Sequence, residues 1–130
     1  MTYEYHEIPL QTVLAGANVI FDGESHCGGI VHRDDTGIFT IKGGTGKWRV
    51  TFFGNLGGAT ADVPATLAIA IGGEPALTTQ MIVTPSVANA LNNVYASVVL
   101  SAPCCVQIAI SNNSAAPETV QNANVIFERL

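Results

Sequence analysis

Short runs of β-branched and aromatic residues, separated by turn residues, follow one another along the chain. Val, Ile, Thr and Phe dominate these runs, and such residues favour the pleated, half-buried surface of a strand. Gly- and Asp-rich turn signals stand between them, and no segment of ten or more residues has helical periodicity. The pattern predicts about ten short strands: Ile8–Leu14, Asn18–Phe21, Ile30–His32, Ile38–Ile41, Lys47–Phe53, Ala65–Ile71, Thr79–Val83, Asn93–Leu100, Val106–Ile110 and Asn124–Arg129.

The predicted strands are of two kinds. In Leu67–Ile71 and Val106–Ile110, large apolar residues alternate with small or polar ones, which is typical of a sheet with one buried face. In Trp48–Phe53 and Val94–Leu100, apolar side chains occur on both faces. Because a sandwich has only one interior, the second apolar face needs a partner, and association of identical chains is the commonest source of one.

The pentapeptide ANVIF occurs twice, at residues 17–21 and 123–127. Little chain lies outside the two copies, so the repeat belongs within one domain rather than to a duplicated one. Both copies carry apolar residues on both faces. We therefore expect two strands in similar surroundings, side by side in one sheet.

Length and charge narrow the class of protein. A chain of 130 residues is near the usual size of one domain. Charged residues make up 12% of it, about half the share typical of soluble proteins, and the net charge is −5. No Lys/Arg cluster is present, which excludes nucleic acid and an anionic membrane as expected partners. The scarcity of charge indicates that part of the surface is covered by other copies of the chain.

Neither a secretory signal nor a membrane span is predicted. The N-terminal stretch has no basic start followed by an apolar segment. The longest apolar run, Leu67–Ile71, covers five residues, whereas about twenty are needed to cross a bilayer.

Candidate chemistry is sparse. His26 and Cys27, with His32, Asp34 and Asp35, form the cluster that would suggest a metal, but its spacing matches no paired zinc-ligand pattern. We therefore expect no resident metal and a loop held by carboxylate-to-backbone hydrogen bonds, leaving open an axial ion with one ligand per chain. The glycine-rich segment 43–47 is not a phosphate loop, because Trp48 follows its lysine.

The three cysteines, Cys27, Cys104 and Cys105, cannot all pair within one chain, and we expect them mostly reduced. Nothing in the sequence supplies a held base and an oxyanion site beside Cys27. We therefore expect neither an enzyme nor a bound cofactor.

The motifs together resemble a known family. The segment 46–52 (GKWRVTF) resembles the Gly-x-aromatic-x-Val-x-Phe strand of the C1q/TNF-like jelly rolls that end bacterial collagen-like glycoproteins of the BclA type. Four further segments follow in the order of that family. They are AGANVIFDG at 15–23, HRDDTGIFT at 32–40, AIAIGGEP at 68–75, and ISNNS at 110–114 with the ending at 124–130.

The resemblance implies an all-β, two-sheet antiparallel jelly roll that forms a homotrimer, with its first and last strands adjacent. Combined with the period of two, it assigns faces to side chains. The expected core residues are Trp48, Val50, Phe52, Val98, Val125 and Phe127. The expected trimer-interface residues are Phe53, Tyr95, Val99 and Ile126, although a one-residue slip would exchange the two faces.

The expected function follows from that family. Residues 1–130 form one jelly-roll domain, in which 1–9 are an N-terminal arm or stalk junction, although no Gly-X-Y repeat precedes residue 10. The resemblance implies a non-catalytic structural or adhesive head on a bacterial cell or spore surface, the exosporium. Its partners would be itself and a host-surface protein or glycan. The alternatives are a carbohydrate- or receptor-binding tip of a phage or bacterial fibre, and a viral capsid or decoration protein.

Overall fold

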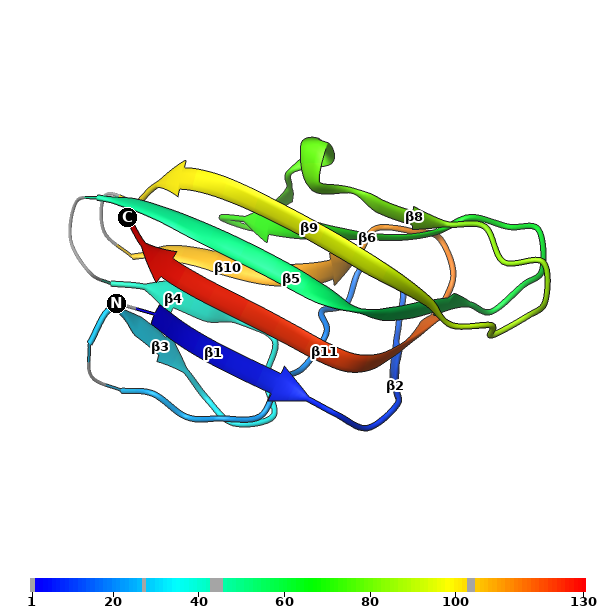
Figure 1. The fold of residues 1–130 in the computed structure, drawn as a ribbon, viewed down its shortest axis with the longest axis horizontal. Helices are drawn as coiled ribbons and strands as arrows, with labels where there is room; N and C mark the ends of the chain where they lie inside the picture. The colour runs from blue at the N-terminus through cyan, green and yellow to red at the C-terminus, as the bar shows by residue number, and fades with distance from the viewer. Residues whose placement is uncertain (1, 27, 43–45, 103–104) are drawn as a thin grey trace.

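Two antiparallel sheets packed face to face form the protein, here described from a computed structural model (Figure 1). The structure describes residues 2–26, 28–42, 46–102 and 105–130. The front sheet consists of β1 (Thr2–Glu7), β11 (Glu118–Arg129), β5 (Lys47–Gly58) and β9 (Asn92–Ser101) in that order, with β2 (Gln11–Val13) also beside β11. The back sheet consists of β3 (Ile30–His32), β4 (Phe39–Ile41), β10 (Val106–Asn112), β6 (Ala65–Ile71) and β7 (Glu74–Pro75), with β8 (Met81–Val83) also beside β6.

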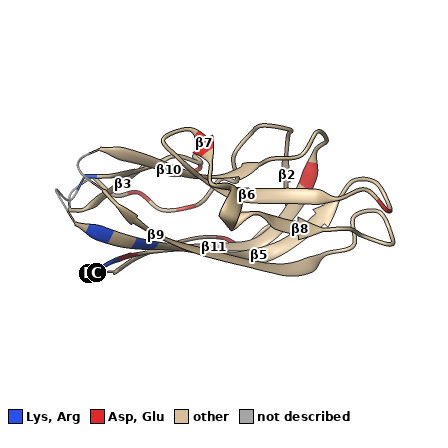
Figure 2. Ribbon diagram, turned by 90° about the horizontal axis from the view of Figure 1, so that it is seen from above, with Lys and Arg blue, Asp and Glu red and all other residues tan. Residues whose placement is uncertain are grey.

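The predicted fold class is confirmed as an all-β antiparallel sandwich. A single 3₁₀ turn, η1 (Leu77–Thr79), interrupts the strands, and the described residues contain no α-helix. No helix within those residues has the length and apolar composition needed to span a bilayer. Figure 2 shows the two layers edge-on.

The two longest strands, β5 and β11, form the middle of the front sheet. On β5, Trp48, Val50 and Phe52 point inward at every second position and are completely buried. On β11 the alternation changes phase, because the pairing with β5 shifts between Gln121 and Asn124. This bulge, in which Asn122 has a φ of 53°, brings Val125 and Phe127 inward after Val120.

Aromatic side chains join the two layers in the centre of the core. Phe39 on β4 lies 5.0 Å from Phe127 and 4.8 Å from Tyr5 of the front sheet, and 5.4 Å from Phe21, between ring centroids. Five of the six expected core side chains are completely buried, whereas Val98 is half-buried. Val98 is less buried because it lies on β9, the outer strand of the front sheet.

Thr2–Glu7 form a strand rather than the expected arm. They constitute β1, which pairs with β11 from Thr2 opposite Glu128 to Glu7 opposite Ala123. Tyr5 is buried against Phe39, and the hydroxyl of Tyr3 accepts a hydrogen bond from Gly29 N at 2.8 Å. Glu4 and His6 point outward and make the strand polar in composition. A search for runs of apolar residues therefore does not detect it.

The expectation that the two ANVIF copies lie side by side is wrong. The copy at 123–127 is within β11, whereas the copy at 17–21 extends the back layer along β10 beyond the end of β4. There Asn18 is bridged to Ser111, and Val19 N donates to Ile110 O at 2.8 Å. The two sheets share one interior, so strands of either sheet direct apolar side chains toward it at every second position. The sequence of a strand therefore does not show to which sheet it belongs.

Candidate interaction surface

Three large apolar side chains lie exposed on the outward surface of the front sheet, here called the front face. Phe53 on β5 is directly opposite Tyr95 on β9, and they retain 40% and 66% of their exposure. Val99, on the same face further along β9 past Ser97, retains 50%. Side chains opposite each other on neighbouring strands contact across the sheet, so Phe53 and Tyr95 form one continuous apolar patch.

Polar groups surround this patch. Thr51 and Ser97, opposite each other in the next row, are joined by a hydroxyl hydrogen bond of 3.1 Å. In the row beyond, Arg49 Nη1 lies 3.9 Å from Glu128 Oε1. Figure 2 shows the basic residues of the front sheet gathered at the end where the chain termini lie. The front face is therefore charged toward the termini and neutral around Phe53.

All four predicted interface residues have their side chains on the front face. Phe53, Tyr95 and Val99 are exposed, whereas Ile126 is half-buried between Glu4 of β1 and Thr51 of β5. Whether another chain covers them stays a prediction.

The period of two places Asn124, with Ile126, on the outward side of the last strand, but sequence reasoning missed the other asparagines that complete this face. Asn55, Asn93, Asn122 and Asn124 line a hollow beside Phe53 and Tyr95. Asn124 Oδ1 lies 2.5 Å from Nδ1 of His6, a residue of the unpredicted strand β1. The alternation of Tyr3 and Tyr5 with Glu4 and His6 is the signal that would have placed β1 here.

Among the described residues of the candidate metal cluster, the two histidines do not converge on a common site. His32 is buried, stacks on Phe39, and has its ring nitrogens 2.5 Å from Gly23 O and 2.9 Å from Thr36 O. Both nitrogens are therefore engaged by backbone carbonyl groups. His26 is exposed and lies 2.9 Å from Glu24, and Cys27 lies outside the described residues.

A different acidic group meets at the end of β1. Carboxylate oxygens of Glu7, Asp22 and Asp35 lie within 4.8 Å of one another. Partial burial, followed by hydrogen bonding to Asp22 and neighbouring negative charge, raises the pKa of Glu7. Hydrogen bonding to Asp22, with the charge of Asp34 beside it, raises the pKa of Asp35. Glu7 and Asp35 therefore retain their protons more readily than isolated carboxyl groups do.

Among the described residues, the hydrogen bonds of the histidines do not reach a thiol or hydroxyl group that a histidine could activate as a nucleophile. Their hydrogen-bond partners are the amide of Asn124, the carboxylate of Glu24 and two backbone carbonyls. Cys105 is exposed, while Cys104 lies outside the described residues.

Comparison with known proteins identifies the class of fold. No family model and no curated protein matches the chain. Among solved structures, murine APRIL at pH 5.0 is similar over 100% of both chains, with 15% identity and a TM-score of 0.70. Eiger TNF from S. frugiperda is similar over 99% of this chain and 92% of its own, with 13% identity and a TM-score of 0.76.

The globular domain of zebrafish complement 1qA is also similar, over 99% of this chain and 94% of its own. Its identity is 13% and its TM-score is 0.67. The chain therefore has the TNF/C1q-like jelly-roll fold, as its motifs predicted.

Proposed function

We propose that the protein is a non-catalytic homotrimeric head domain whose front face is covered by two further copies of the same chain. The observation that carries the proposal is the exposure of three large apolar side chains on the front face, Phe53, Tyr95 and Val99, on a chain with only 12% charged residues. The resemblance to C1q/TNF-like jelly rolls supports three copies rather than two.

Burial of this patch is energetically favourable. Full burial of a large apolar side chain contributes about 1.5–3 kcal/mol. The adjacent hydroxyl groups of Thr51 and Ser97 already bond each other, so one of their two O–H donors keeps its partner when the face is covered. Arg49 and Glu128 carry opposite charges on the same face. In a symmetric assembly the Arg49 of one copy can therefore meet the Glu128 of another.

The position of the chain ends supports a head carried on a stalk. Thr2 lies opposite Glu128, so β1 begins at the end of the sandwich where β11 finishes (Figure 1). A stalk joined before residue 2 would leave from that end, and the loops at the opposite end would point away from it. From the resemblance to bacterial collagen-like glycoproteins we propose a structural or adhesive role on a bacterial cell or spore surface, with a host-surface protein or glycan as the outside partner.

Solution mass tests the assembly. We expect light scattering coupled to size exclusion to give three times the 13.5 kDa chain mass. Phe53→Glu places a charge in the centre of the patch and should reduce the mass to that of one chain. The matched control is Ile82→Glu, because Ile82 is an exposed apolar residue on β8 of the back sheet. A single-chain mass for the wild type, or equal masses for both variants, would contradict the proposal.

A further inference from the structure

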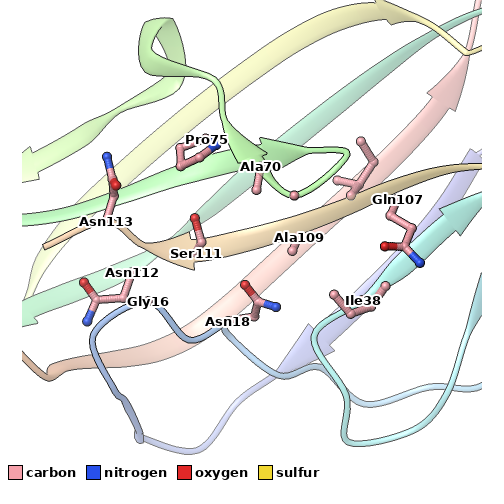
Figure 3. Close-up of a pocket in the computed structure, with 12 residues that line it drawn as sticks. Gly16, Asn18, Ile38, Ala70, Pro75, Gln107, Ala109, Ser111, Asn112 and Asn113 are labelled. Carbon is pink, nitrogen blue, oxygen red and sulfur yellow. The ribbon is translucent and has the colours of Figure 1, made fainter.

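A pocket of about 270 Å³ lies on the outward surface of the back sheet, directly over β10. Figure 3 shows the β6–β7 hairpin on one side of it and the segment containing Gly16 and Asn18, with Ile38, on the other. Ala70 and Ala109, which are opposite each other on β6 and β10, belong to its floor. All of its lining residues belong to one chain, and we call it the back pocket.

Ser111 is the feature of this pocket that indicates a ligand. Its side chain points outward on β10, with Ala109 and Gln107, and the residue retains only 8% of its exposure. Its Oγ has no hydrogen-bond partner among the described residues. Buried hydroxyl groups are nearly always paired, so an unpartnered one lining a pocket is a position where a ligand atom would bond.

The other polar groups of the pocket are neutral amides. Asn18 is bridged to Ser111, and Gln107 and Asn113 stand further along β10 and just beyond its end. None of the twelve residues that line the pocket is charged. An amide offers both donors and acceptors, and a hydroxyl offers the same combination. The matching ligand is uncharged and carries several hydroxyl groups.

The size and floor of the pocket restrict the ligand further. A volume of 270 Å³ is just below the range of about 300–1,000 Å³ that holds drug-sized ligands, which suits a single ring. The methyl groups of Ala70 and Ala109 give an apolar floor for C–H groups. We propose that the back pocket binds one ring of a neutral sugar, with a ligand hydroxyl bonded to Ser111 Oγ and others to Asn18 and Gln107.

Close packing holds the wall that contains Asn18. A Cβ at Gly37 would lie 2.6 Å from Asn18 Cβ and 2.8 Å from Val19 O, so the absence of a side chain lets the 36–38 loop pack against this wall. The backbone and Cβ of Asn18 are therefore positioned before any ligand arrives, which reduces the ordering cost of binding.

Amide NMR of the isotope-labelled protein tests this site. The probes are methyl α-D-glucopyranoside, methyl β-D-galactopyranoside and N-acetylglucosamine, with glucuronate as a charged comparison. We expect at least one neutral probe to shift the amides of Gln107, Ala109 and Ser111 in a saturable way, and glucuronate to bind more weakly. Ser111→Ala should weaken the binding about tenfold, the effect of one lost hydrogen bond to a ligand. Ala109→Leu, which fills the floor, should abolish it.

Two control variants show whether the effects are specific to the back pocket. Ser86→Ala, in an exposed segment between β8 and β9, should leave the affinity unchanged. The Phe53→Glu variant should bind equally well, so failure of the trimer and failure of the sugar site are distinguishable. Absence of shifts with every neutral sugar, unchanged affinity in Ser111→Ala, or a crystal grown with the sugar that holds only water at Ser111 would each overturn the proposal.

Discussion

The two copies of ANVIF lie in opposite layers of the sandwich, yet they send the same residues inward. Val19 and Phe21 of the first copy, like Val125 and Phe127 of the second, are completely buried. The asparagines point the other way. Asn18 lines the back pocket, and Asn124 lines the hollow beside Phe53 on the front face.

The copies differ in what holds their backbones. Ile126 lies in a regular strand, paired with Glu4 on one side and Thr51 on the other. Ile20 is instead held by one side chain: its N–H donates to Gln11 Oε1 at 3.0 Å, and its carbonyl accepts from Gln11 Nε2 at 3.1 Å. Local sequence thus decides which side chains are buried, whereas distant partners decide what kind of element the segment forms.

Truncation of the two buried phenylalanines should have the largest effect. Phe21→Ala and Phe127→Ala should each lower the free energy of unfolding by about 3–5 kcal/mol, because each leaves a cavity beside Phe39. Chemical denaturation followed by tryptophan fluorescence measures both. Because the two rings contact the same neighbour, the double variant should depart from additivity. A loss below about 1 kcal/mol for Phe21 alone would show that the first copy is not part of the common core.

Removal of the side chain that holds Ile20 should have a smaller effect. Gln11→Ala leaves the N–H and carbonyl of Ile20 without these partners, so we expect a loss of about 1–3 kcal/mol. The matched control is Gln121→Ala, at a half-buried glutamine on β11 just before the second copy. That control should stay within about 0.5 kcal/mol of the wild type. If Gln11→Ala and Gln121→Ala lowered the free energy of unfolding equally, the side chain of Gln11 would have no special role in holding the first copy of ANVIF.

The alternation along β5 was predictable because it is local. Trp48, Val50 and Phe52 occupy every second position of an uninterrupted strand, so the period of two suffices to place them inside. The outward direction of Phe53, Tyr95 and Val99 follows from the same rule. Val98 faces the core as expected but is only half-buried, since nothing in the local pattern shows that β9 is an outer strand.

Features that join distant segments were not predictable. The acidic group forms because β1 brings Glu7 beside Asp22 and Asp35, and the polar composition of β1 conceals that strand. The back pocket likewise depends on the bridge between Asn18 and Ser111, residues 93 positions apart in the sequence. Periodicity describes how a strand divides its side chains between two faces, but not which strands become neighbours.

The smallest expected effect concerns the start of β11, the strand that carries the second copy. Glu118 retains 2% of its exposure, and its Oε1 accepts hydrogen bonds from Thr66 N at 2.8 Å and from the Ser114 hydroxyl. Its Oε2 has no partner among the described residues. Burial raises the pKa of Glu118, and these two hydrogen bonds oppose that rise.

A raised pKa means that the folded protein binds this proton more tightly than the unfolded chain does. The resulting stabilisation is fully present below the ordinary glutamate pKa and is lost as the pH rises through the folded value. Glu118→Gln cannot titrate, so the stability of the wild type relative to this variant should fall as the pH rises from the ordinary glutamate pKa through the raised pKa of folded Glu118. Ser114→Ala removes a hydrogen bond that favours the carboxylate and should make the fall steeper. Denaturation curves across this range measure both changes in stability. If the wild type instead becomes more stable relative to Glu118→Gln as the pH rises, the hydrogen bonds to the carboxylate outweigh the effect of burial. In that event the start of β11 would be held by a stable buried carboxylate, and the second copy of ANVIF would have a polar anchor comparable to Gln11 in the first.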